Sequence, residues 1–81
     1  MMHPEAVREK LVQSFPNSEV VVQDTTGTMD HFQVLIISPL FEGKSMVEQH
    51  QMVYKALGNL MKEAIHALAL KTYTPQQWKN S

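Results

Sequence analysis

Residues 32–48 of this 81-residue chain read FQVLIISPLFEGKSMVE, and this stretch decides the fold. It begins with residues 32–37, which are apolar except for Gln33 and predict a strand buried in the middle of a sheet. Pro39 ends that strand, because proline cannot donate a hydrogen bond to a neighbouring strand. Ser45 and Glu48 then form the S-x-x-E pattern that caps the start of a helix. We therefore expect a central strand followed by a loop and a long helix.

The flanking segments predict an α-β-β-α-β-α order. Apolar residues at helical spacing indicate a helix over residues 4–15, and a run of three valines indicates a strand over residues 19–24 that pairs antiparallel with the central strand. After the long helix, residues 65–71 are expected to form a third strand through a β-α-β crossover. Residues 74–78 favour a short terminal helix that docks through its tryptophan.

One face of the long helix is expected to cover the sheet. The predicted core-facing residues are Met46, Val53, Leu57, Leu60 and Ala64, with Val47, Tyr54 and Met61 at the margins. Gly58 is a weak point inside this helix, because glycine lowers helix stability. His50 lies away from the apolar stripe and is expected to face solvent.

Composition excludes several classes of function. The chain has 7 Lys+Arg against 8 Asp+Glu, a formal charge of -1, which does not favour nucleic acid as a partner. It contains no cysteine, so it has no disulfide, no thiolate zinc site, no cysteine nucleophile and no self-contained Cys-ligated iron–sulfur centre. No segment is typical of a signal peptide or a membrane span, and we expect residues 1–81 to form a single cytoplasmic domain with no membrane association.

No motif supports catalysis or nucleotide binding. Residues 38–45 resemble a phosphate-binding loop, but Ser38 stands where the first glycine is required and Pro39 lacks an amide hydrogen. The glycines are too far apart for the G-x-x-G loop that clamps RNA. Serine, histidine and aspartate are scattered without triad spacing. We therefore expect a protein that binds other molecules and is not an enzyme.

His31 and His66 are the candidate metal ligands. Each stands at the start of a predicted strand, and a helical crossover makes these two strands parallel, so their N-terminal ends lie at the same end of the sheet. Neighbouring strands lie about 4.8 Å apart, which allows two imidazoles to reach one metal ion or one partner surface. The alternative for a histidine at a strand start is a packing role.

The chain resembles the BolA family over residues 7–78. The matching residues are Phe32-x-Val34, Ser38-x-x-Phe41-Glu42-Gly43-Lys44-Ser45, His50 with Val53-Tyr54, Ile65-His66-Ala67-Leu68, and Lys71-Thr72-Tyr73-Thr74-Pro75 with Trp78. Residues 43–47 and 51–54 are most similar to the IbaG-like bacterial branch. The resemblance implies a class II KH-like α/β fold in which helices cover a three-stranded mixed sheet.

The resemblance also implies an iron–sulfur function. BolA-like proteins form heterodimers with CGFS monothiol glutaredoxins and share a [2Fe–2S] cluster that the glutaredoxin cysteine and a glutathione thiol also hold. This implies His66 as a cluster ligand and His31 as the candidate for the second, with a role at the strand start as the alternative for His31. The isolated chain would then hold no cofactor, and a homodimer is a further assembly that the resemblance leaves open.

A DNA-binding transcriptional regulator is the alternative function. Many BolA-like proteins carry Arg-His-Arg on the long helix, whereas this chain has Gln49-His50-Gln51. Because two cations that would contact phosphate are absent, we expect weak DNA binding. Under this alternative, Lys44, His50 and Lys55 would contact DNA.

Overall fold

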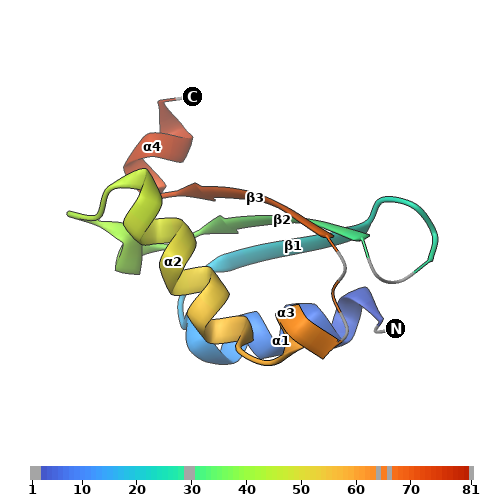
Figure 1. Cartoon of the computed structure of the whole chain (residues 1–81). Coiled ribbons are helices and arrows are strands. Elements are labelled where there is room, and N and C mark those ends of the chain that lie inside the picture. Colours follow the sequence, from blue (N-terminus) through green and yellow to red (C-terminus); the bar gives the residue numbers. More distant parts are fainter. Residues whose placement is uncertain (1–2, 29–30, 64, 66, 81) are drawn as a thin grey trace.

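The computed structural model describes residues 3–28, 31–63, 65 and 67–80 of the chain. The elements are α1 (Pro4–Ser14), β1 (Glu19–Asp24), β2 (His31–Ile37), the 3-10 turn η1 (Pro39–Phe41), α2 (Met46–Leu57), α3 (Leu60–Glu63), β3 (Ala67–Tyr73) and α4 (Pro75–Lys79) (Figure 1). This order confirms the predicted succession, with the long helix divided into two. None of the helices in these ranges is long and apolar enough to cross a membrane.

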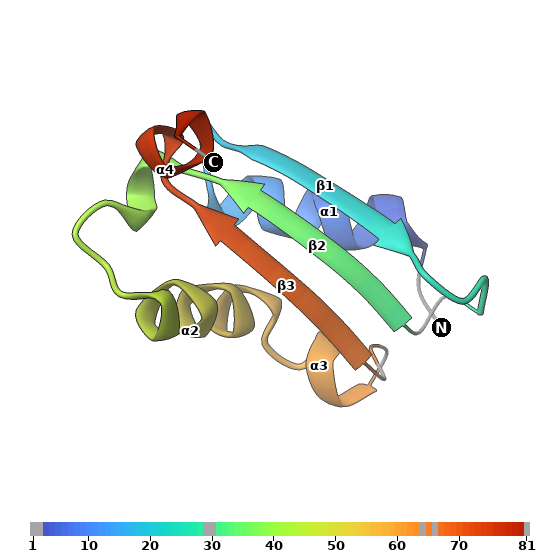
Figure 2. The same cartoon turned by 90° about the horizontal axis from the view of Figure 1, so that it is seen from above.

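The three strands form one mixed sheet in the order β1-β2-β3 (Figure 2). β1 pairs antiparallel with β2, and β2 pairs parallel with β3, as the hairpin and the crossover predict. The apolar β2 is the central strand. Its residues Phe32, Val34 and Ile36 are fully buried, because they alternate toward the face that the helices cover.

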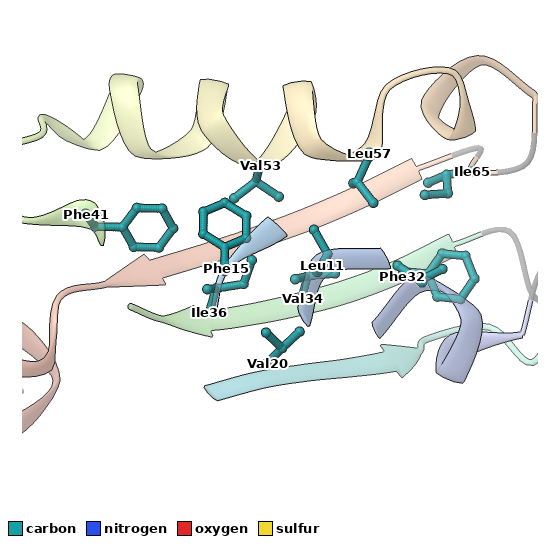
Figure 3. Packing of buried hydrophobic residues seen from close by; sticks show 11 residues of the cluster. Leu11, Phe15, Val20, Phe32, Val34, Ile36, Phe41, Val53, Leu57 and Ile65 are labelled. Carbon is teal, nitrogen blue, oxygen red and sulfur yellow. The ribbon is translucent and has the colours of Figure 1, made fainter. Parts of the chain in front are cut away.

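α1 and α2 cover one face of the sheet, and their buried residues join those of the strands in one core (Figure 3). The core residues are Val7, Leu11, Phe15, Val20, Phe32, Val34, Ile36, Phe41, Val53, Leu57 and Ile65. On the opposite face α4 lies against the end of the sheet (Figure 1). The rings of Trp78 and Tyr73 lie 5.3 Å apart in this contact. We call this side, on which Val21 is 46% exposed, the open face of the sheet.

The predicted long helix ends at Gly58. This glycine has φ 55° and ψ -127°, a backbone conformation that side chains with a Cβ rarely adopt. α3 follows as a separate turn, and the amide of Ile65 donates to the carbonyl of Leu60 at 2.8 Å. The third strand therefore begins at Ala67, two residues later than predicted, and continues to Tyr73.

The buried face of α2 is narrower than predicted. Val53 and Leu57 are buried, but Met46, Val47 and Tyr54 are exposed, and Ala64 lies outside the described residues. Gln49 occupies the buried face instead. Its side chain accepts a hydrogen bond from Thr72 Oγ1 at 2.7 Å and donates to the carbonyl of Lys44 at 3.1 Å. A polar pair thus joins α2 to β3 where the sequence favours an apolar contact.

Candidate functional site

The described part of the candidate metal site is the N-terminal end of β2 and β3. His31 is the first residue of β2, and its Cα partner in the parallel pairing is Ala67, the first residue of β3. The predicted juxtaposition of these two strand starts is confirmed. His66 directly precedes Ala67 in the sequence but lies outside the described residues, so its assignment as a ligand stays a prediction.

The hairpin between β1 and β2 fixes the backbone of His31. The carbonyl of His31 accepts hydrogen bonds from the amide of Thr25 at 3.0 Å and from Thr25 Oγ1 at 3.2 Å. The Oδ1 atom of Asp24 accepts hydrogen bonds from the amides of Thr26 and Gly27, which orders the start of the loop. His31 is half-buried and alternates with the buried Phe32, which places its side chain on the open face of the sheet.

This end of the sheet can supply imidazole nitrogen to a metal whose other ligands come from elsewhere. The chain contains no cysteine. Within residues 3–28, 31–63, 65 and 67–80, no three side chains of His, Asp or Glu are grouped closely enough to hold a metal ion. The donor chemistry fits an iron–sulfur cluster in which histidines replace two thiolates on one iron, provided that a partner supplies the sulfur ligands.

The residues of the DNA-binding alternative do not form one cluster. Lys44 and Lys55 are exposed and line a shallow groove of about 320 Å³ along α2, together with Glu48. His50 does not line this groove. The expectation that His50 faces solvent is wrong, because its side chain is half-buried and its Nε2 atom is buried and has no hydrogen-bond partner among the residues that the structure describes.

Position 49 is not a lost phosphate contact. Gln49 is 1% exposed, and its bond to Thr72 directs it to the core, whereas Gln51 is exposed and lines the groove with the two lysines. Sequence reasoning missed the buried Gln49 because it treated a polar residue as a surface residue. Its position three residues after Met46 and four before Val53 places it on the apolar stripe and could have revealed it.

Glu48 is held as a carboxylate at the start of α2. Its Oε1 atom accepts a hydrogen bond from the amide of Ser45 at 2.8 Å, and its own amide donates to Ser45 Oγ at 3.2 Å. The predicted capping box is therefore confirmed. The hydrogen bond from the backbone of Ser45, supported by its side chain and by the charge of Lys44, lowers the pKa of Glu48 from its ordinary value of 4.5. This negative charge lines the same groove as the two lysines.

Comparison with known proteins identifies the family. The BolA-like protein family matches residues 10–77. The DNA-binding transcriptional regulator BolA of Escherichia coli is 34% identical over 86 residues, which cover 98% of this chain and 82% of that protein. The structure of a BolA homologue from Coxiella burnetii has a TM-score of 0.82 and 34% identity, and the match covers 98% of this chain and 99% of that one. The BolA domain of SufE1 from Arabidopsis thaliana has a TM-score of 0.81 and 33% identity, with 90% and 92% covered.

These matches extend over almost the whole chain and include its sheet and helices. They do not distinguish the branches of the family, so the similarity to the IbaG-like branch stays a prediction. The chain belongs to the BolA family.

Proposed function

We propose that this protein is an adaptor for iron–sulfur clusters that binds a CGFS monothiol glutaredoxin and lends imidazole nitrogen to a shared [2Fe–2S] cluster. The observation that carries this proposal is the register between β2 and β3. His31 pairs with Ala67, which directly follows His66 in the sequence. Two histidines of a chain without cysteine are thus associated with one end of the sheet.

The composition of the site supports a shared cluster. Because the chain has no thiolate, the sulfur ligands have to come from the glutaredoxin cysteine and from glutathione. Histidine can replace thiolate on one iron of a [2Fe–2S] cluster. Ala67, beside His31, is exposed and small, which leaves space for a partner to approach the strand ends. The complex carries the cluster as cargo, and this chain acts as a binding protein.

The test is reconstitution of the complex from this protein, a CGFS monothiol glutaredoxin, glutathione, iron and sulfide. We expect H66A and H31A each to alter the visible circular dichroism of the cluster and to remove a nitrogen coupling in pulsed electron paramagnetic resonance of the reduced state. H3A is the matched control, because His3 is exposed and its side chain does not cap α1.

The two substitutions separate the roles of the two histidines. If H66A changes the spectra and H31A does not, His31 has the structural role at the strand start and the cluster takes its second ligand elsewhere. If both variants give the wild-type spectra, the proposal is rejected, and a heterodimer without imidazole ligation replaces it.

A DNA-binding function is the second candidate, because Lys44 and Lys55 share one groove and the E. coli relative is named as a DNA-binding transcriptional regulator. The nearby carboxylate of Glu48 and the net charge of -1 oppose strong binding to phosphate. We expect weak retardation of duplex DNA at low salt that disappears as salt rises. The double substitution K44Q/K55Q should abolish this retardation. The control K79Q, which removes a lysine of α4, should leave it unchanged. Absence of retardation by the wild type at low salt would eliminate this function.

A further inference from the structure

Met46 connects the protein surface to a buried polar contact. It is the first residue of α2, and it is 56% exposed. Its Sδ atom lies 3.7 Å from Thr72 Oγ1 and is a possible acceptor for the hydroxyl, although Thr72 itself is only 1% exposed. A reagent in solvent can therefore reach a side chain whose sulfur contacts the interior.

The Thr72 hydroxyl has one proton and two acceptors. The second acceptor is Gln49 Oε1, at 2.7 Å, and Gln49 is itself buried. A thioether sulfur is a weak acceptor, so the Thr72 hydroxyl donates its hydrogen bond to Gln49 Oε1. The contact between α2 and β3 thus depends on sulfur remaining the poorer of the two acceptors.

We propose that Met46 is a peroxide-reactive site whose oxidation to methionine sulfoxide weakens the contact between α2 and β3. A sulfur lone pair attacks one oxygen of hydrogen peroxide, the O–O bond breaks, and water leaves. The sulfur loses two electrons and the peroxide gains them. The product is a polar, chiral sulfoxide, which a thiol-dependent reductase can return to the thioether.

The position of the sulfur determines the consequence. An oxygen bonded to Sδ and directed at Thr72 lies closer to the hydroxyl than the sulfur does, and it accepts a hydrogen bond more strongly. The Thr72 hydroxyl then donates its hydrogen bond to the sulfoxide oxygen instead of to Gln49. Gln49 Oε1 loses its donor in a buried position, which destabilises the folded state.

Met46 is the most exposed of the described methionines, and no cysteine competes with it for peroxide. Met52 and Met61, the other methionines in the described ranges, are half-buried and pack against the core. The chain has no cysteine to react first. Thr72 is the sixth residue of β3, whereas the His31 partner Ala67 is the first, so the site lies at the opposite end of the strand and is independent of the proposed cluster function.

The experiment follows oxidation and stability together. The full chain is treated with hydrogen peroxide, and the sulfoxide content of each methionine peptide is measured by mass spectrometry over time. We expect Met46 to oxidise several-fold faster than Met52 and Met61. Equal or slower oxidation of Met46 would overturn the proposal.

The second measurement is the thermal midpoint before and after treatment. We expect treatment to lower the midpoint of the wild type and to shift the side-chain amide signals of Gln49 in NMR spectra. M46L, an apolar replacement of similar volume at an exposed position, should show neither change, which also excludes effects of the other methionines. If peroxide treatment lowers the thermal midpoint of M46L as much as that of the wild type, the proposal is overturned.

Thr72 variants test the mechanism. In T72V the hydroxyl is absent, so oxidation of Met46 should leave the midpoint unchanged. T72S keeps the hydroxyl and should retain the effect, and it provides the comparison if T72V does not fold. If T72S loses the sensitivity to peroxide while Met46 is still oxidised, the coupling through the hydroxyl is wrong.

Discussion

Glu48 has two functions in the first turn of α2. Its carboxylate accepts the hydrogen bond from the amide of Ser45, and its negative charge lies at the positive end of the helix. Both effects favour the ionised form in the folded protein, in agreement with the lowered pKa of this side chain. The same carboxylate lies beside Lys44 and Lys55, so the charge that stabilises the helix start also weakens the candidate DNA surface.

A pH titration of stability should reveal the contribution of Glu48. Because the pKa in the folded state is lowered, stability from this group is fully present above the ordinary pKa of 4.5 and is lost as pH falls through the lower folded value. E48Q keeps an amide oxygen for the Ser45 amide but does not titrate. We expect urea unfolding to show a smaller loss of stability for E48Q than for the wild type as pH falls below 4.5.

The matched control is E9Q, which removes an exposed carboxylate of α1 outside any capping box. It should lose stability in acid in parallel with the wild type. If E48Q does so too, the capping carboxylate does not contribute to the acid sensitivity of the fold.

Single residues mark the limits of prediction from this sequence. The capping boxes could be predicted, because a hydroxyl and a Glu or Gln three residues later satisfy backbone amides locally. The spacing of Gln49 from Met46 and Val53 is a signal for its burial. Its hydrogen-bond partner and the burial of His50 could not be predicted, because both depend on which face of α2 meets β3. That contact involves Thr72, 23 residues away from Gln49 in the sequence.

At the scale of elements, the strands were predictable and the helix division was not. β1 has the predicted bounds, and β2 begins at His31, one residue before the predicted apolar segment. Both strands could be predicted because runs of β-branched and apolar residues define them. The apolar spacing of α2 continues through Leu60 and Met61, so periodicity predicts one helix. The positive φ of Gly58 ends it instead, and this turn displaces the start of β3 to Ala67.

The parallel arrangement of β2 and β3 is the part of the candidate site that sequence could predict. A right-handed crossover requires β2 and β3 to be parallel, and their starts then lie together. The individual contributions of His31 and His66 could not be predicted, because the proposed ligation would depend on a second protein. The hydrogen bonds from Thr25 position the backbone of His31 within the hairpin.

At the scale of the whole molecule, folding and complex formation should fail in different ranges of pH. Only neutral imidazole ligates a metal, so the proposed cluster complex should weaken as pH falls below the range near ~6.5 in which free histidine titrates. The fold loses the contribution of Glu48 only below 4.5. Between these ranges, we expect a folded chain that no longer holds the shared cluster.

Parallel titrations from pH ~8 to ~5 measure this separation. Visible circular dichroism reports the cluster of the heterodimer, and far-ultraviolet circular dichroism reports the fold of this chain alone. The glutaredoxin with its own cluster, titrated without this chain, corrects for acid loss from the partner. The heterodimer could lose its cluster only in parallel with the glutaredoxin alone, or only at the pH at which this chain unfolds. Either result would show that imidazole protonation does not control the complex and would contradict nitrogen ligation of the cluster by this chain.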